Sequence, residues 1–199
     1  MELENLVQAV TDSLFVELEA SGRHVHVTGE QAMTLFGHPL TPARPLSQPG
    51  QFLARERVTL VGEKGEFRDV AVLGPERREG QVEISLTDGR VLGIAPPVRL
   101  SGDVEGSPGI VLVGSNGRVE LTQGVIAAKR HIHLTPRAAA HFGVKNGENV
   151  KLKALTRRPV IFEDVSVRVS EQFAPFAHLD YDEANACGFC RGDLGRILK

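Results

Sequence analysis

The sequence is poor in aromatic residues: of its 199 residues none is tryptophan, one is tyrosine, and Phe, Trp and Tyr together make up 5%. Few aromatic side chains leave little surface on which the bases of a single-stranded nucleic acid can stack. The formal net charge is only -2, and acidic and basic residues are interspersed, so no extended basic face is expected. We therefore expect no nucleic-acid partner and no charged attachment to a membrane. Small molecules are the expected partners.

Long apolar runs are also missing. No stretch approaches the ~18 to 20 consecutive apolar residues that span a bilayer, and the first residues, "MELENLVQAV", lack a basic region followed by an apolar core. These features predict a cytoplasmic protein with no membrane span. The two cysteines, Cys187 and Cys190 in "ACGFCRG", are too few for an extracellular disulfide framework. No second pair accompanies them, so we interpret them as two incidental thiols in place of a redox pair or half a zinc site.

One phrase occurs twice. "RHVHVTGEQAMTLFG" begins at Arg23, and "RHIHLTPRAAAHFG" begins at Arg130. The chain is long enough for two domains of roughly 80 to 100 residues, each with its own core. The repetition predicts two such domains.

Short alternating runs separated by glycine-containing turns dominate the rest of the chain. "RVTLVGEKGEFRDVAVLGP" is typical of a strand, a turn and a second strand, and residues 81–94, 109–134 and 149–170 continue the pattern. With 21 glycines and 11 prolines, the chain has the turns that many short strands require. We predict a mainly β fold of two small β-barrel domains capped by short helices, with an N-terminal helix.

Helices are few in this prediction. Residues 1–16 carry apolar side chains at helical spacing, so they predict an amphipathic helix. Its apolar side has two alternatives: packing on its own domain or on a subunit of a homo-oligomer, or binding the groove of another protein. Thr28 and Thr135 predict N-caps of two short helices that end near Gly37 and Gly143. Residues 38–51, which contain four prolines, predict a loop.

The repeated phrase contains two histidine pairs. In a strand, His24 and His26 point to the same face, and so do His131 and His133. Two imidazoles so placed suit a shared metal ion, although a single pair without a ligand is an equally good interpretation. His178, in "PFAHLDYDEANA", is a candidate third ligand for the second pair, and Glu83, in "QVEIS", for the first. The alternatives are a structural histidine and a glutamate on a solvated strand face.

A competing pattern overlaps the first pair. "HVHVTGEQAMTLFG" has the histidine, glutamate and glycine spacing of a cupin metal site, with Glu30 as the acidic ligand. That site requires Glu30 on a strand. Because the capped helix predicted here includes Glu30, and the second copy has Arg137 at the equivalent place, we interpret this match as chance.

Further phrases complete a recognisable set, from "LSQPGQF", "VTLVG" and "VLGPERR" to "TDGRVLGI", "PPVRLSGD" and "GVIAAKRHIHLTP". With the histidine phrases they run in order from about Arg23 to Ala186, and the chain resembles the PduL-type phosphate propanoyltransferases, the phosphotransacylases of bacterial microcompartments. The resemblance implies reversible conversion of an acyl phosphate and coenzyme A (CoA) into acyl-CoA and phosphate, with propanoyl or acetyl as the acyl group. It also implies a microcompartment location, a place in propanediol degradation, and a shell or cargo protein as partner of the N-terminal helix.

The resemblance further implies two β-barrels with a two-zinc site between them, and it assigns roles to residues. It places one zinc on His24, His26 and Glu83 and the other on His131, His133 and His178, although cobalt, nickel or iron also suit imidazole. It implies Arg77, or its neighbour Arg78, at the phosphate, with Glu83 also counted as catalytic. The implied domains are residues 1–16, 23–128 and 129–199, the last joined by a strand at about 13–22. Two other functions stay open, a dimetal hydrolase and a non-enzymatic metal-binding module.

Overall fold

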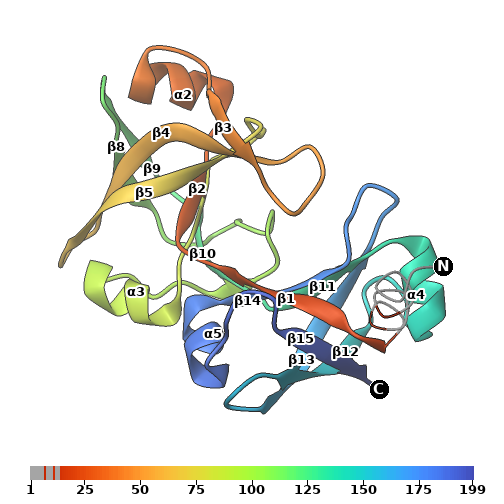
Figure 1. Ribbon diagram of the computed structural model, residues 1–199. Helices are drawn as coiled ribbons and strands as arrows, with labels where there is room; N and C mark the ends of the chain where they lie inside the picture. The colour runs from red at the N-terminus through yellow and green to blue at the C-terminus, as the bar shows by residue number, and fades with distance from the viewer. Residues whose placement is uncertain (1–6, 8–10, 12–13) are drawn as a thin grey trace. The chain divides into compact units, whose positions relative to one another are not determined.

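The computed structural model describes residues 7, 11 and 14–199 (Figure 1). The predicted helix over residues 1–16 lies outside the described residues for most of its length. The fold is mainly β, as predicted, with short helices between the strands. The chain forms two compact units, one of residues 22–129 and one that combines the segment ending at Ser21 with Arg130–Lys199.

The unit of Arg130–Lys199 is a closed barrel with the strand order β1-β14-β11-β13-β12-β15. β1 comes from the other end of the chain, yet it lies beside β14 in parallel and beside β15 in antiparallel orientation (Figure 1). The barrel and its helices comprise β1 (Val16–Ser21), β11 (His131–Leu134), α4 (Pro136–Phe142), β12 (Asn149–Leu155), β13 (Val160–Val169), β14 (Phe176–Asp180), α5 (Tyr181–Cys187) and β15 (Leu194–Leu198).

The unit of residues 22–129 is a curled sheet of nine strands with the order β7-β10-β6-β2-β5-β4-β8-β9, and β3 pairs with β4. The antiparallel pair of β4 and β5 forms its long hairpin (Figure 1). The elements are β2 (His24–His26), α2 (Gly29–Phe36), β3 (Pro42–Pro45), β4 (Phe52–Val61), β5 (Glu66–Gly74), β6 (Gln81–Glu83), α3 (Leu86–Leu92), β7 (Val98–Arg99), β8 (Ile110–Val113), β9 (Arg118–Leu121) and β10 (Val125–Ala128).

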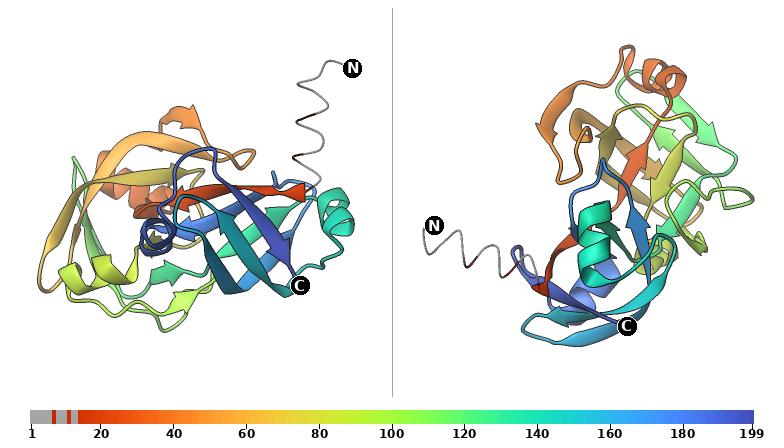
Figure 2. Two further views of the ribbon diagram at one scale, coloured as in Figure 1. Left: turned by 60° about the horizontal axis from the view of Figure 1, so that its bottom comes forward. Right: turned by 90° about the vertical axis from the view of Figure 1, so that its right-hand side faces the viewer.

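Each unit has a separate hydrophobic core. In the unit of residues 22–129, side chains such as Val25, Leu60 and Leu112 are fully buried. In the barrel, Ile132 and Leu152 are fully buried, and Ala139 brings α4 onto the same core; both views of Figure 2 show α4 against the barrel strands. Burial of these apolar side chains is the main favourable contribution to the stability of each unit.

The caps predicted for two helices are confirmed. The Thr28 hydroxyl accepts a hydrogen bond from Gln31 N and begins α2, and the Thr135 hydroxyl accepts one from Ala138 N and begins α4. Gly37 ends α2 with a φ of 80° and Gly143 ends α4 with a φ of 66°, a left-handed conformation that glycine adopts without a Cβ clash.

Two other expectations are wrong. Residues 81–94 are strand only at β6 (Gln81–Glu83), because Leu86–Leu92 form α3: the Ser85 hydroxyl accepts a hydrogen bond from Asp88 N, and this local cap overrides the apparent alternation. Residues 38–51 are not entirely loop, because Pro42–Pro45 form the edge strand β3. An edge strand tolerates proline since one of its sides needs no N–H donors.

The two units repeat one plan. A short strand with a histidine pair leads into a capped helix in both, as β2 and α2 and as β11 and α4. β5 runs parallel to β2, and β13 runs parallel to β11. Among the described residues, the non-glycine positions with positive φ are Asp69 in β5 at 56° and Asp164 in β13 at 54°. The structural repeat therefore extends beyond the phrase that is repeated in the sequence. Over the same part of the chain, no helix is long and apolar enough to cross a bilayer.

Candidate metal centres

The first candidate centre lies in the middle of the sheet of residues 22–129. β2 carries His24 and His26 between β5 and β6, and Glu83 in β6 lies directly opposite His24 in the antiparallel register. The three side chains are buried, with residue exposures of 6%, 3% and 7%. Glu83 is thus not on a solvated strand face. One ligand atom from each residue lies within 4.8 Å of the others.

Hydrogen bonds orient both imidazoles of this centre. Nδ1 of His24 lies 2.8 Å from the carbonyl oxygen of Gly22, and Nδ1 of His26 lies 3.3 Å from that of Leu73. A carbonyl oxygen only accepts, so each Nδ1 carries the proton and donates it. The lone pair of each ring is then on Nε2, which lies 3.5 Å from Glu83 Oε2 in His24 and 4.0 Å from Glu83 Oε1 in His26. Both Nε2 atoms therefore face the carboxylate.

A network of buried and half-buried polar side chains holds the Glu83 carboxylate. The Gln81 amide donates to Glu83 Oε1 at 2.6 Å and to the Ser101 hydroxyl oxygen at 2.9 Å. Arg77 Nη1 donates to the same hydroxyl at 3.1 Å, and the Ser101 side chain hydrogen-bonds Glu83 in turn. The main-chain N–H of Gly102 donates to Gln81 Oε1 at 2.8 Å. Ser101 and Gln81 therefore connect the Arg77 guanidinium to the carboxylate.

Electrostatics favour metal-binding protonation states at Glu83 and His26. At His24 burial lowers the pKa, but the Glu83 carboxylate and the Gly22 carbonyl outweigh it and raise that pKa above its ordinary value. Burial alone would raise the pKa of Glu83, but His24, His26 and the hydrogen bond from Ser101 hold it far below its ordinary value. Burial, with the charges of His24 and Arg77, lowers the pKa of His26 well below the ordinary value. An ionised carboxylate and a neutral imidazole are the forms that bind a divalent metal.

The second candidate centre lies in the barrel. His131 in β11 is directly opposite His178 in β14, and His133 follows two positions along the same strand. The ring centroids are 4.6 Å apart for His131 and His133, 5.0 Å for His131 and His178, and 4.9 Å for His133 and His178. Across the parallel pair of β1 and β14, Glu19 lies opposite His178 and places Oε2 3.4 Å from its Nδ1. A carboxylate at Nδ1 orients a ring to bind metal through Nε2.

These residues fit a metal ion. Neither ring nitrogen of His133 has a hydrogen-bond partner among the described residues, although the residue is only 7% exposed. Burial, helped by His131 and Arg168, lowers the pKa of His133 to about 3, so its ring is neutral at pH 7 with a lone pair to offer. Two ligand atoms on one tetrahedral zinc lie roughly 3.4 Å apart. Within each centre the three candidate ligand atoms lie within 4.8 Å of one another, somewhat wider than that spacing.

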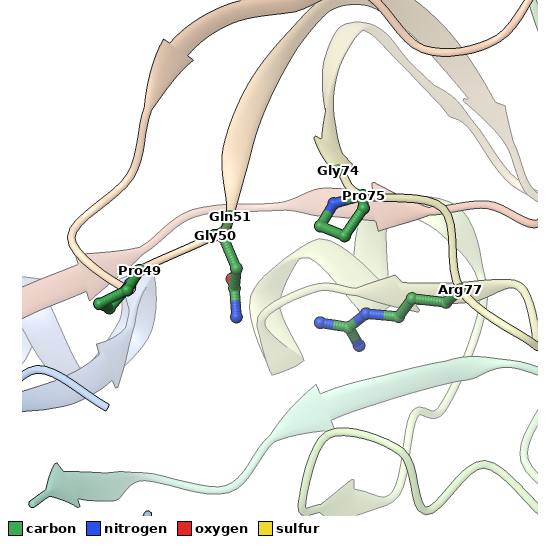
Figure 3. A pocket seen from close by; sticks show the side chains of 6 residues that line it. All are labelled: Pro49, Gly50, Gln51, Gly74, Pro75 and Arg77. Carbon is green, nitrogen blue, oxygen red and sulfur yellow. The ribbon is translucent and has the colours of Figure 1, made fainter. Parts of the chain in front are cut away.

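Arg77 lines a pocket in the unit of residues 22–129. The pocket has a volume of about 230 Å³ and is formed by Pro49, Gly50, Gln51, Gly74, Pro75 and Arg77. In Figure 3 the side chains of Gln51 and Arg77 both reach into the space below Pro75. Arg78 is exposed and does not line the pocket. A guanidinium beside so small a space suits an anion the size of phosphate.

Several candidates from the sequence lie elsewhere. Glu30 is exposed in α2 and is not part of the group formed by His24, His26 and Glu83, which agrees with the chance interpretation of the cupin pattern. Cys187 is buried at the end of α5, where its thiol donates to Ala184 O; Cys190 is exposed and its sulfur accepts from Arg157 at 2.7 Å. Neither belongs to the metal-ligand groups found among the described residues.

Sequence reasoning assigned no role to Gln81, Ser101 and Glu19. Gln81 and Ser101 lie within phrases that support the family resemblance, "QVEIS" and "PPVRLSGD". Their contact with each other joins residues from different parts of the sequence, and no local pattern encodes it. Glu19 belongs to the alternating stretch before the first histidine pair, and only the register of β1 with β14 places it at His178.

Comparison with known proteins shows the family of the chain. Residues 17–190 match the family described as Phosphate propanoyltransferase. A phosphate propanoyltransferase of Clostridioides difficile is 49% identical over 99% of this chain and 95% of its own length. Relatives of the same name from Enterococcus faecalis and Listeria monocytogenes are each 53% identical over 92% of this chain, covering 88% and 87% of their own lengths. The chain therefore belongs to the phosphate propanoyltransferase family of acyltransferases.

Proposed function

We propose that the protein transfers an acyl group reversibly between phosphate and coenzyme A, with propanoyl or acetyl phosphate as substrate and two zinc ions per chain. The relatives that bear the name phosphate propanoyltransferase support the reaction. The observation that carries the metal part is the pair of three-ligand groups, the buried His24, His26 and Glu83 in one unit and the partly buried His131, His133 and His178 in the other. Three protein ligands leave one position of a tetrahedral zinc open, which is typical of catalytic sites.

Bound zinc would supply two effects: it stabilises the thiolate of coenzyme A at neutral pH, and it polarises the acyl phosphate. The protein's own residues supply the rest. Arg77 lies in the small pocket and provides a planar fork of donors for the phosphate oxygens. Its bond to Ser101 Oγ holds the guanidinium in place and couples it to Gln81 and Glu83. Arg78 is exposed, which favours Arg77 for this role.

The transfer we propose is direct. The coenzyme A sulfur attacks the acyl carbon, the bond from that carbon to the phosphate oxygen breaks, and the oxygen leaves with the bonding electrons as phosphate. The thiol proton passes to solvent. No protein nucleophile is required, and neither cysteine lies in a candidate centre: Cys187 is buried in the barrel core, and burial raises the pKa of its thiol.

The function is tested by two assays on the same protein. Loss of the coenzyme A thiol, followed with a chromogenic thiol reagent after adding propanoyl or acetyl phosphate, is the result we expect. Release of phosphate without coenzyme A would instead show a dimetal hydrolase, in which a metal-bound water is the nucleophile. Metal content without either reaction would show a non-enzymatic metal-binding module. Either of these results would overturn the proposal.

We also propose that residues 1–16 bind a shell or cargo protein and bring the enzyme into a microcompartment. The apolar positions Leu3, Leu6, Val7, Val10 and Leu14 support an amphipathic helix. Fusion of this segment to a fluorescent protein in cells that assemble microcompartments should give puncta. Diffuse fluorescence would contradict the proposal and favour packing of the helix on its own domain or on a second copy of the chain.

A further inference from the structure

Each candidate metal centre has the same strand register. Glu83 lies directly opposite His24 across the antiparallel pair of β2 and β6. His178 lies directly opposite His131 across the antiparallel pair of β11 and β14. In both units, therefore, the third ligand comes from a strand farther along the chain and faces the first histidine of the pair. This third ligand, Glu83 or His178, is the distant ligand of its centre. The relative position of two strands decides whether the ligands of a centre meet.

A helix follows the distant ligand closely in both units. Ser85 caps α3 just after Glu83, and Asp180 caps α5 just after His178. Each cap is a reciprocal capping box, in which Asp88 and Glu183 accept a hydrogen bond from the N–H of the capping residue. These two acidic side chains are thus fixed in space by the first turn of their helices.

Each of these acids also binds the arginine that directly precedes a histidine pair. Arg23 Nη2 lies 2.7 Å from Asp88 Oδ1 and its Nε lies 3.1 Å from Asp88 Oδ2, a bidentate pair. Arg130 Nη1 lies 2.6 Å from Glu183 Oε1, and its Nε donates to Glu163 O at 2.7 Å. Both acids are shielded from water, with side-chain exposures of 7% and 17%.

Phenylalanine supports the arginine in both units. The Arg23 guanidinium lies 4.1 Å from the ring centroid of Phe67, and that of Arg130 lies 6.0 Å from the centroid of Phe162. Phe67 lies in β5 and Phe162 in β13, the strands that run parallel to the histidine strands. An arginine over an aromatic face is attracted to it and loses rotational freedom. The same three-part contact therefore occurs once in each unit.

We propose that Arg23 with Asp88, and Arg130 with Glu183, are two equivalent clamps that position the metal ligands, each acting on the centre in its own unit. The inference rests on the metal part of the proposed function. Each clamp connects the residue before the first histidine to the helix after the distant ligand. It thereby holds the two ligand-bearing strands in the register that brings their side chains together. None of the four residues belongs to the candidate ligand groups found among the described residues, so they are positioning residues.

The clamps predict a site-specific loss of metal affinity. In the full chain carrying His131→Ala and His133→Ala, only the centre of His24, His26 and Glu83 remains. Adding Arg23→Gln to this protein should weaken Zn²⁺ binding about 10- to 100-fold, which is the usual effect of removing a residue that orients metal ligands. Adding Arg130→Gln to the same protein should leave the affinity unchanged. In the reciprocal protein, with His24→Ala and His26→Ala, the two arginine substitutions should exchange their effects.

The readout is competition for Zn²⁺ with a chromogenic chelator, measured on metal-free protein, and it does not depend on enzyme activity. Arg68→Gln is the matched control, because Arg68 pairs with Glu66 on the surface and its side chain is 81% exposed. Arg23→Lys and Asp88→Asn change the side-chain size little and keep part of the hydrogen bonding, and they serve if Arg23→Gln does not fold. Lysine keeps the charge but not the bidentate fork, so we expect partial recovery.

The outcomes separate the clamps from the rest of the account. The clamp proposal is overturned if Arg23→Gln lowers the melting temperature of the metal-free protein but leaves its zinc affinity unchanged. It is also overturned if either arginine substitution lowers the zinc affinity of both centres equally. A parent chain that binds no zinc would overturn both the clamps and the metal part of the function. Tight zinc binding with the predicted losses, but no acyl transfer, would leave the clamps standing and remove the proposed reaction.

Discussion

At the scale of single residues, the candidate centres depend on buried and half-buried polar groups whose partners are fixed. Ser101 illustrates this, because its hydroxyl accepts from Arg77 and from Gln81 while its side chain also bonds Glu83. Removing one member of such a network leaves the others without their partners in a region of low dielectric. Small changes here should therefore affect catalysis more strongly than they affect folding.

Replacing Ser101 with alanine should lower kcat/KM for acyl phosphate about 10- to 100-fold, because Arg77 and Glu83 lose their common partner. Steady-state kinetics at several acyl phosphate concentrations measure the effect. Ser107→Ala is the control: this hydroxyl is buried, whereas Ser101 is half-buried, and it accepts from Gly124 N at 2.9 Å and donates to Val104 O at 2.7 Å, and neither bond joins the network. Equal losses of activity in the two variants would show that Ser101 is merely structural.

The cysteines should be dispensable for the reaction. Direct transfer needs no acyl-enzyme, so the double variant Cys187→Ala, Cys190→Ala should keep turnover close to that of the unmodified chain. Because Cys187 is fully buried, its truncation should reduce the free energy of unfolding, by about 1 kcal/mol. Turnover per folded molecule is the relevant quantity. Its loss in the double variant would show that a thiol takes part in the chemistry.

At the scale of elements, β1 is a structural part of the barrel although it comes from the opposite end of the sequence. It lies between β14 and β15 in the closed order, and Leu18 is only 1% exposed in the barrel core. β1 also brings Glu19 to His178. The strand thus serves both the stability of the barrel and the orientation of a candidate ligand.

Leu18→Ala should destabilise the barrel by about 2–5 kcal/mol, the usual cost of truncating a fully buried leucine. Hydrogen exchange should become faster at buried amides of the barrel, such as Leu152, and should change less at Val72 in the other unit. Glu17→Ala, at the neighbouring half-buried position, is the control. Unchanged exchange at Leu152 would mean that β1 contributes little to this core.

Local signals decided which elements the sequence could predict. Thr28 and Thr135 mark the starts of α2 and α4, and Gly37 and Gly143 mark their ends. The structure confirms these caps. α3 was not predictable from alternation, because Ser85 and Asp88 form their capping box inside a stretch that otherwise alternates like a strand. The clamps were not predictable either, since the pairs of Arg23 with Asp88 and Arg130 with Glu183 depend on tertiary contacts.

At the scale of the whole molecule, one plan is used twice with one change of ligand. Both units place a histidine pair opposite a ligand that precedes a capped helix, but that ligand is Glu83 in one unit and His178 in the other. A carboxylate adds a negative charge that a third imidazole does not. The two centres therefore offer a metal ion different net charges and, by the same argument, different preferences for an anionic fourth ligand.

The zinc content of the chain tests the central claim most directly. Protein equilibrated with zinc and freed of excess metal should contain two ions per chain. The double variant with His24→Ala and His26→Ala should contain one ion, and so should the double variant with His131→Ala and His133→Ala. Acyl transfer should be lost in both. Two ions in either double variant, or full-speed transfer by the metal-free chain, would contradict the account.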